Sequence, residues 1–405
     1  MESHLCKVCG GSNLHKIIDF GSIPNANEFE EKGVASKAKT YKLAFYWCAD
    51  CTLFQQLDLA PPESLFNANY TYITSMNKPT IENFRQFAAK IGRQLKKKDF
   101  AVVVASNDGT EIQLLKNAGF KKVIGVDPSS NVAAIANKKG LFTIVDFFDE
   151  PLSKKIAKEY GQADLVVAKG VFAHIPDPRD MLAGMKNLIN EDGRIMIEVH
   201  WLKSLVDKAE IDSLYAEHYY EFDMKAMRWL ANGMGLKIVA AEYLPHMQGG
   251  EIRFILKTKG NEDAVKKFID EEAKAGLYTL NGIKRLRTRA IKRKKKLNNL
   301  LLNLKAKNKK IGVWAVPAKV PQLFNFCGIT DKLVDCAYEI TDYKIGKIIP
   351  KTDIQIKDEH ALRQDMPDYL ILGAWNYIDF AKKHLKWYTN KGGKLIDPLN
   401  CIVLN

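Results

Sequence analysis

Short apolar runs alternate with amphipathic segments from residue 100 onward, and this alternation organises most of the chain. Five runs have the length and composition of buried strands, at 101–104, 123–126, 142–145, 164–168 and 194–199. Helical periodicity follows the first two of them, at 111–118 and 131–139. Strands that alternate with helices predict a parallel, doubly wound α/β sheet, which binds ligands at the carboxyl ends of its strands.

A second series of the same kind begins at residue 309, with apolar runs at 311–316, 335–340, 369–372 and 394–396. It predicts a further, Rossmann-like α/β domain. Ahead of it, apolar residues at helical spacing predict an amphipathic helix: Ile283, Leu286, Ala290, Leu297, Leu300, Leu301 and Leu304. We therefore expect four parts: a small N-terminal domain (1–75), an α/β domain (76–260), a helical connector (261–308) and a C-terminal α/β domain (309–405).

The composition is that of a globular protein, with 46% hydrophobic and 27% charged residues among 405. No apolar run approaches the roughly 20 residues that span a bilayer, and the N-terminus lacks a signal-peptide pattern. The sequence therefore predicts a cytoplasmic protein without a membrane partner.

The net charge of +14 is concentrated in one segment. Residues 284–310 hold thirteen Lys or Arg and no Asp or Glu, so the remainder of the chain carries only +14 − 13 = +1. A local basic stretch is weaker evidence for nucleic acid than a basic domain. The predicted helix is either a solvated connector or an electrostatic aid to binding an anionic ligand, and nucleic acid is not the expected partner.

Four of the seven cysteines form two CxxC pairs, Cys6/Cys9 and Cys48/Cys51. Each pair places two thiolates on a tight turn, and two such turns complete a tetrahedral shell around Zn²⁺. A thioredoxin-like redox motif would need only one pair. We therefore predict a structural zinc site, with a loop or small sheet inserted between the pairs, and no catalytic role for the metal because all four positions are filled by protein.

The first two predicted strands of the α/β domain end in residues suited to a nucleoside cofactor. Ser106-Asn107-Asp108-Gly109 follows the first strand, and Asp127-Pro128 ends the second, where a carboxylate can accept hydrogen bonds from both ribose hydroxyls. The GxGxxG spacing of a dinucleotide site is missing, which favours S-adenosylmethionine over NAD. The alternative is that these acids are ordinary loop residues. Further candidate cofactor contacts are Asp146 and Phe147 beside the adenine, Lys169 after the fourth strand, and Tyr72 and Ser75 in the segment before the domain.

A phenol, a carboxylate and an imidazole lie within four residues at Tyr215, Glu217 and His218. This combination suits proton abstraction beside a carbonyl. His174 lies in the loop after the fourth strand and is a further candidate. The alternatives are a surface Glu-His pair and a structural loop histidine.

Candidate substrate contacts come from four other segments. Tyr70 precedes the α/β domain, and Gly249-Gly250 permit close approach of the backbone. Arg253 could hold a phosphate or carboxylate. Lys319, Trp375 and Asn376 lie in loops of the C-terminal domain.

Together these features resemble the bacterial sugar C-methyltransferases that act on nucleotide-linked ketosugars. The resemblance covers essentially the whole chain and rests on motifs in a fixed order: Cys6/Cys9/Cys48/Cys51, Ser106-Asn107-Asp108-Gly109-Thr110, Gly125-Val126-Asp127-Pro128-Ser129, Val171-Phe172-Ala173-His174-Ile175, Tyr215 to His218, Gly249-Gly250, Pro317-Ala318-Lys319, Phe326-Cys327-Gly328-Ile329 and Gly373-Ala374-Trp375-Asn376.

The resemblance implies a zinc-binding N-terminal domain, a class I S-adenosylmethionine domain and a C-terminal Rossmann-like domain. It implies that His218 is the general base, that Glu217 and Tyr215 orient it and the substrate oxygens, and that His174 is a further polar group in the same pocket. The substrate would be a nucleotide-linked 4-ketosugar methylated at carbon 3. Separately from the resemblance, a monomer is the default expectation, and the sequence leaves the oligomeric state open. This chain departs from the family pattern with Ala105 in place of Gly, Ala216 and Gln248 in place of His, and His200 in place of Pro.

Two other functions are compatible with the sequence. One is a methyltransferase whose acceptor is not a sugar, or is an oxygen or nitrogen atom. The other is a zinc-ribbon nucleic-acid-binding protein that uses the basic stretch, which would show strongly salt-dependent affinity. Exchange of a substrate C–H with solvent separates carbon methylation from both.

Overall fold

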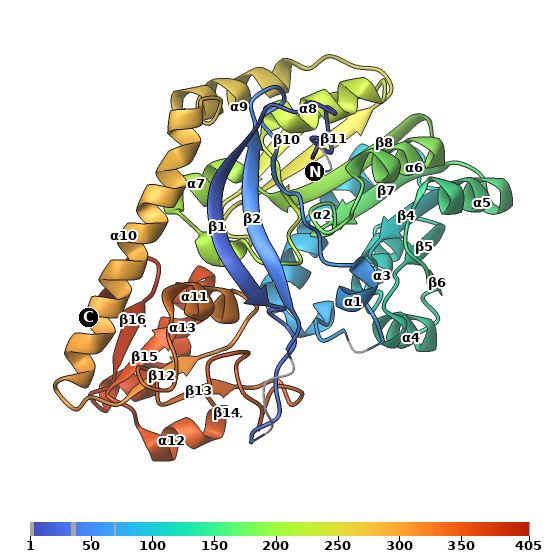
Figure 1. Ribbon diagram of the computed structural model, residues 1–405. Helices are drawn as coiled ribbons and strands as arrows, with labels where there is room; N and C mark the ends of the chain where they lie inside the picture. The colour runs from blue at the N-terminus through green and yellow to red at the C-terminus, as the bar shows by residue number, and fades with distance from the viewer. Residues whose placement is uncertain (1–3, 34–37, 69, 405) are drawn as a thin grey trace. The chain divides into compact units, whose positions relative to one another are not determined.

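The computed structural model describes residues 4–33, 38–68 and 70–404, and the chain divides into two compact units (Figure 1). Unit 1 comprises Met1–His15, Tyr46–Ser204 and Tyr219–Leu280. Unit 2 comprises Lys16–Phe45, Leu205–His218 and Asn281–Asn405. Each unit is therefore assembled from segments that lie far apart in the sequence.

Unit 1 is built on a seven-stranded sheet in the order β10-β11-β8-β7-β4-β5-β6. The strands are β4 (Phe100–Val104), β5 (Lys122–Val126), β6 (Thr143–Ile144), β7 (Ala163–Lys169), β8 (Ile189–His200), β10 (Lys237–Leu244) and β11 (Glu251–Lys257). Strands β4 to β8 are mutually parallel, and β11 runs antiparallel to both of its neighbours. The predicted doubly wound sheet is confirmed, and its strand order reverses between β4 and β7, where such sheets bind ligands.

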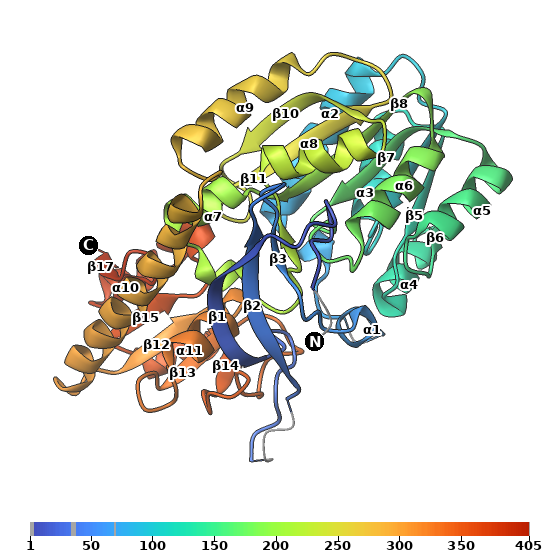
Figure 2. The same ribbon diagram turned by 45° about the horizontal axis from the view of Figure 1, so that its top comes forward.

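Helices cover both faces of this sheet, which explains why β4 and β7 are buried along their whole length. Helices α2 (Lys78–Gln94), α3 (Thr110–Asn117) and α4 (Ser130–Lys138) share a core with the strands, in which Phe87, Ile112 and Val103 are buried. Helices α5 (Glu150–Tyr160) and α6 (Pro178–Leu188) lie side by side (Figures 1 and 2). The side chains of Asp149 and Asp177 cap the starts of these two helices. Helices α8 (Met224–Gly233) and α9 (Asp263–Lys274) complete the unit.

The N-terminal residues contribute three strands to a smaller sheet in the order β1-β2-β3-β9. Its strands are β1 (Leu14–Pro24), β2 (Thr40–Cys48), β3 (Phe54–Gln56) and β9 (Tyr220–Glu221), and it is accompanied by α1 (Pro62–Leu65) and η1 (Thr74–Met76). The long strands β1 and β2 lie between the two cysteine pairs in sequence, which confirms the predicted insertion of a small sheet (Figure 2).

Unit 2 contains a six-stranded sheet in the order β14-β13-β12-β15-β16-β17. Its strands are β12 (Ile311–Trp314), β13 (Cys336–Glu339), β14 (Ile356–Asp358), β15 (Tyr369–Leu372), β16 (Lys394–Asp397) and β17 (Ile402–Leu404), and only β17 is antiparallel to its neighbour. This is the strand order of a Rossmann-like domain, as predicted. Helices α11 (Lys319–Cys327), α12 (Leu362–Asp365), α13 (Ile378–His384) and α14 (Lys386–Asn390) and the turns η3 (Glu359–Ala361) and η4 (Trp375–Tyr377) connect the strands.

The predicted amphipathic helix is α10 (Leu280–Lys305), which Figure 1 shows as one long helix. Six of its seven predicted apolar positions are buried, and Leu300 is half-buried. Two further elements, α7 (Leu202–Lys208) and η2 (Ile211–Ser213), lead toward the Tyr215–His218 segment. Within the described residues, none of the helices combines the length and apolar character needed to cross a membrane.

Candidate active site and metal centre

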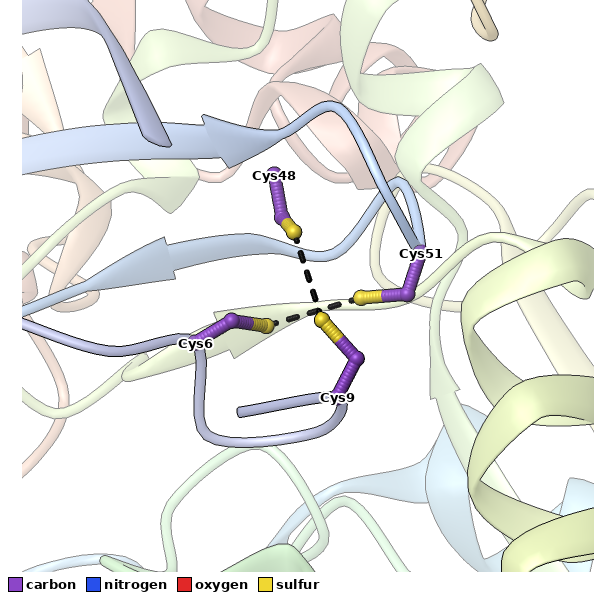
Figure 3. A group of neighbouring side chains, drawn as sticks. All are labelled: Cys6, Cys9, Cys48 and Cys51. Atoms are coloured by element: carbon purple, nitrogen blue, oxygen red, sulfur yellow. Dashed lines mark hydrogen bonds between the residues drawn. The ribbon is translucent and has the colours of Figure 1, made fainter. Parts of the chain in front are cut away.

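The four paired cysteines converge on one point (Figure 3). Their sulfur atoms all lie within 4.8 Å of one another, and the Cys6–Cys51 and Cys9–Cys48 sulfurs are 3.5 Å apart. Four thiolates bound tetrahedrally to Zn²⁺ at about 2.3 Å are separated by about 3.8 Å, so the observed cluster has the size of a zinc site. Contacts with Cys48 and Cys6, together with burial, raise the pKa of the Cys51 thiol. A bound cation would stabilise the deprotonated sulfur atoms and so offset their mutual repulsion.

Backbone hydrogen bonds shape the first of the two knuckles. The Gly11 N–H donates to the Cys9 sulfur at 3.4 Å, and the Gly10 N–H donates to the Cys6 carbonyl at 2.9 Å. The Lys7 N–H donates to the Gln55 side chain on β3 at 3.1 Å, which ties the knuckle to the adjoining sheet. The centre is therefore held by protein on all sides and is of the closed, structural kind.

The predicted cofactor turn connects β4 to α3. Asn107 has a φ of +50° and Gly109 of +79°, so the backbone passes twice through the left-handed region. A Cβ at Gly109 would lie 2.7 Å from Leu141 and 3.0 Å from Ala136, so glycine is required there for space as well as for conformation. Ala105 also lies in the left-handed region, at φ +56°.

The segment that carries Tyr70, Tyr72 and Ser75 packs on this turn. The Asn107 side chain accepts a hydrogen bond from the Thr74 N–H at 2.9 Å and donates to the Tyr72 carbonyl at 3.0 Å. The Ser75 N–H donates to Asp108 at 3.3 Å. The structure thus brings Tyr72 and Ser75 to the predicted cofactor turn. The sequence had suggested them only because their segment directly precedes the α/β domain. The structure also gives the Asn107 and Asp108 side chains partners within the protein.

Asp127 follows β5 at the edge where the strands end. Its Oδ2 accepts from the Asn107 N–H at 2.8 Å, and its Oδ1 accepts from the Ser129 N–H at 2.9 Å. The carboxylate is buried, and burial raises its pKa. Since each carboxylate oxygen has a second lone pair, the group can still accept hydrogen bonds from ribose hydroxyls.

The remaining cofactor candidates fall into two environments. Asp146 is exposed and Phe147 half-buried just after β6, and Pro128 is half-buried after β5, so all three lie at the carboxyl edge of the sheet. Lys169 is instead buried at the end of β7. Its ammonium lies 2.6 Å from Glu111 and 4.1 and 4.2 Å from the ring centroids of Phe84 and Phe87. To contact the cofactor, the Lys169 ammonium would have to bind it in addition to Glu111. This contact stays a prediction.

His174 lies in the loop after β7 and is half-buried. Its ring meets Phe66 edge-on with centroids 5.6 Å apart, and Phe66 in turn lies 5.5 Å from Tyr70. The Tyr219 N–H donates to the Ala173 carbonyl at 2.8 Å, which fixes the loop. These contacts place His174 in the same aromatic group as Tyr70, within unit 1.

Tyr215, Glu217 and His218 form a single turn in unit 2. The His218 N–H donates to the Tyr215 carbonyl at 2.9 Å, and the two rings lie 4.1 Å apart at 36°. Glu217 is only 4% exposed and accepts a 2.6 Å hydrogen bond on Oε1 from the Asn27 side chain. Burial raises the pKa of the Glu217 carboxyl to about 7, whereas the Asn27 hydrogen bond opposes this shift. Asn27 was not among the residues predicted from sequence, because it lies 190 positions away and carries no recognisable motif.

The predicted substrate contacts Gly249 and Gly250 lie in a turn of unit 1, where Gly250 has defined partners. A Cβ on Gly250 would lie 2.4 Å from the Ser204 hydroxyl, and the Gly250 carbonyl accepts from the Trp201 N–H at 3.0 Å. Gly249 and Gly250, with φ of +99° and +131°, therefore close the turn between β10 and β11. The backbone approaches Ser204 closely at Gly250. Contact of the pair with a substrate stays a prediction.

Arg253 is 5% exposed and lies in an internal network. Its guanidinium donates to Glu198 at 2.8 Å, to Asn83 at 2.8 Å and to Glu242 at 3.0 Å. An anionic ligand would have to displace one of these acceptors, so the predicted substrate role of Arg253 remains a hypothesis.

Lys319 begins α11 after β12, and Trp375 and Asn376 lie in η4 after β15. The order of the second sheet reverses between these two central strands. The Lys319 ammonium lies 4.6 Å from the Trp375 ring centroid and donates to the Ser213 hydroxyl at 2.8 Å. The Trp375 indole donates to Asp212 at 2.5 Å. The geometry therefore connects these elements to the segment that carries Tyr215, Glu217 and His218.

Several basic side chains of α10, and Lys309 just after it, have partners within unit 2. Arg289 donates to the Val206 carbonyl at 2.8 Å, and Arg293 donates to the carbonyls of Lys208 at 2.6 Å and of Ala209. Other pairs join Lys294 to the Phe326 carbonyl, Lys296 to the Asn400 carbonyl, Lys305 to Asp335 and Lys309 to Asp368. Much of the cationic excess thus stabilises the unit itself.

Comparison with known proteins finds similarity to three successive domains. Three family models match in succession: a zinc binding domain at 6–66, a methyltransferase domain at 85–241 and a C-methyltransferase C-terminal domain at 246–400. The fold and its cofactor edge define a class I, S-adenosylmethionine-dependent methyltransferase with a structural zinc site. The three matches, in this order along the chain, support a C-methyltransferase with an N-terminal zinc-binding domain.

A relative matches along nearly the whole chain. The C-methyltransferase NovU of Streptomyces niveus is 28% identical over 402 residues, covering 97% of this chain and 95% of that protein. Solved structures match over the methyltransferase domain. The plantazolicin methyltransferase BpumL is 11% identical (46% of this chain, 88% of that chain, TM-score 0.37), and a methyltransferase of Archaeoglobus fulgidus is 15% identical (44% and 94%, TM-score 0.36). The similarity to C-methyltransferases rests on the domain matches and on NovU.

Proposed function

We propose that this C-methyltransferase acts on a nucleotide-linked ketosugar and methylates the carbon beside the ketone, with His218 as the general base. The observation that carries the proposal is the turn in which the His218 and Tyr215 rings lie 4.1 Å apart and which also holds the buried residue Glu217. The sugar acceptor follows from the family resemblance of the whole chain.

The chemistry begins with the acidity of the substrate. A ketone acidifies the neighbouring C–H, and a neutral imidazole with a pKa near ~6.5 can take that proton at neutral pH. The C–H electron pair then becomes an enolate, whose carbon forms the new C–C bond. S-adenosylmethionine, when bound, supplies the electrophilic methyl group and leaves as S-adenosylhomocysteine. The proton held by His218 afterwards passes to solvent.

Glu217 and Tyr215 have supporting roles in this scheme. The ionised carboxylate of Glu217 would stabilise the imidazolium that forms at His218, and the Tyr215 hydroxyl would donate to a substrate oxygen. His174 is proposed as a further polar group of the reaction. The zinc is assigned no step, because four thiolates leave no open position on the metal.

Two features support a nucleotide-linked acceptor. Unit 2 provides a second Rossmann-like sheet, and Lys319 and Trp375 lie at the point where its strand order reverses, the place where sheets of this type bind nucleotides. A cation beside an indole ring is suited to a phosphate and an adjacent flat base. Tyr70, Gly249, Gly250, Arg253 and Asn376 are retained as candidate substrate contacts.

The test is methyl transfer by the purified zinc-loaded protein to a panel of nucleotide-linked 4-ketosugars, followed by mass spectrometry and carbon NMR. The proposal predicts a gain of one methyl on the carbon next to the ketone. Binding of S-adenosylmethionine without methyl transfer to any member of the panel would overturn the sugar assignment. A methyl on oxygen or nitrogen would overturn the carbon chemistry.

A further inference from the structure

The segment Leu205–His218 is anchored inside unit 2 at its start. Helix α7 ends at Lys208, and its last carbonyls receive the guanidinium groups of Arg289 and Arg293 on α10. Cations at the carboxyl end of a helix satisfy unpaired carbonyls and complement the helix dipole. Two of the basic residues of α10 therefore hold the end of α7.

The middle of the same segment is held by side chains. Asp212 accepts from the Trp375 indole at 2.5 Å, and Ser213 accepts from Lys319 at 2.8 Å. All four residues are buried, so these hydrogen bonds are shielded from competing water. Residues up to 213 are therefore fixed before the chain reaches the Tyr215–His218 turn.

The end of the segment is contacted by Asn27, from the connection between β1 and β2. The Asn27 side-chain amide donates to Glu217 Oε1 at 2.6 Å. Asn27 is itself held, because its backbone N–H donates to the Asn25 side chain at 3.0 Å and the Asn25 N–H donates to the Lys39 carbonyl at 3.3 Å. An amide that is fixed at its own backbone can fix the orientation of the carboxyl that it binds.

We propose that Asn27 is a positioning residue for catalysis: its amide orients the Glu217 carboxylate beside His218. The proposal rests on the proposed function of the Tyr215–His218 turn and adds to it a group from the N-terminal region. A hydrogen bond from a neutral donor to a buried charged acceptor is among the stronger ones in proteins. Its loss would leave Glu217 both less ionised and less well oriented when His218 takes up its proton.

The experiment compares two substitutions with a matched control in the zinc-loaded protein. Asn27→Ala removes the donor, and Asn27→Asp keeps the shape of the side chain without its N–H groups. Asn187→Ala is the control, since Asn187 makes an amide–carboxylate contact at 3.4 Å with Glu150 on the surface of unit 1. We expect kcat to fall about tenfold or more in both Asn27 variants, with unchanged KM for S-adenosylmethionine and unchanged activity in the control.

Three results would overturn the proposal. A kcat within twofold of wild type in Asn27→Asp would show that the donor is dispensable. A parallel loss of kcat, cofactor affinity and melting temperature would show a merely structural role. A kcat loss as large in Asn187→Ala as in Asn27→Ala would show that the effect is not specific.

A measurement without substrate separates this proposal from the proposed function. Carbon NMR can follow the titration of the Glu217 carboxyl, with Glu217→Gln identifying its signal. Removal of the Asn27 donor is expected to move the midpoint upward from its wild-type value near pH 7, because the hydrogen bond lowers the pKa. An unchanged midpoint would contradict the Asn27 proposal. Absence of methyl transfer by the wild type would instead contradict the proposed function.

Discussion

The Asp127 carboxylate accepts a 2.8 Å hydrogen bond from the backbone N–H of Asn107, across the carboxyl ends of β4 and β5. The acid that is expected to bind the cofactor ribose is therefore held by the turn that is expected to surround the rest of the cofactor. Asn107 in turn holds the backbone of Tyr72 and Thr74. Hydrogen bonds thus connect three segments of unit 1 at the candidate cofactor site.

Asp127→Ala should weaken binding of S-adenosylmethionine by about ten- to a hundredfold, because it removes an acceptor for two ribose hydroxyls and releases the Asn107 turn. Isothermal titration calorimetry measures this directly. Asp192→Ala, at an exposed acid, is the control. Unchanged affinity in a folded Asp127→Ala protein would contradict the assignment of the cofactor edge.

Glu217→Gln should be more stable than wild type at alkaline pH. Burial raises the pKa of Glu217 from 4.5 to about 7, so the folded state keeps a proton that the unfolded chain has lost over this range. The stability that this protonation contributes is fully present below about pH 4.5 and is lost as the pH rises through 7. The difference between variant and wild type should therefore grow over this window to on the order of 3 kcal/mol. Denaturant melts at pH 5 and pH 8 test the sign, and equal differences at the two values would contradict it.

Zinc removal should unfold part of the protein rather than block a chemical step. One zinc per chain is expected by native mass spectrometry, and Cys48→Ser should lose it and lower the melting temperature, because the metal joins knuckles that are 39 positions apart. Cys336→Ser, at a buried cysteine outside the cluster, should retain the metal. A metal-free protein with wild-type stability would contradict a structural role.

Ala105→Gly should stabilise the protein by about 1 kcal/mol. Ala105 lies at φ +56°, a conformation that costs a residue with a Cβ about 1–2 kcal/mol, part of which is offset by the greater flexibility of Gly in the unfolded chain. Urea unfolding measures the change, and a destabilised variant would show that the methyl group of Ala105 contributes packing that outweighs the strain.

The sequence was sufficient to predict the main strands and helices and the cysteine cluster. The apolar runs around Val103 and Val167 predicted the parallel sheet because both of its faces are buried, and CxxC spacing predicted the cysteine cluster because both pairs have the same short-range geometry. The amphipathic face of α10 was predicted for the same reason: helical periodicity is a local signal.

Contacts between distant segments were not predictable. Asn27 and Glu217, or Trp375 and Asp212, are brought together by the fold, and neither pair has a local pattern. The interior partners of Lys169 and Arg253 were also missed, because sequence alone cannot tell a charge paired inside the protein from one that faces a ligand. The division into two units could not be predicted either, because each unit combines chain segments that lie far apart in the sequence.

The most direct test of the central claim is hydrogen exchange at the substrate carbon in deuterated water, with S-adenosylhomocysteine bound so that no methyl is transferred. A nucleotide-linked 4-ketosugar that the wild type methylates is incubated with wild type and His218→Ala, and deuterium uptake is followed by mass spectrometry. We predict uptake next to the ketone with the wild type, and a loss of at least about a hundredfold in His218→Ala with cofactor affinity retained. Exchange at the wild-type rate in His218→Ala would contradict the assignment of His218 as the base.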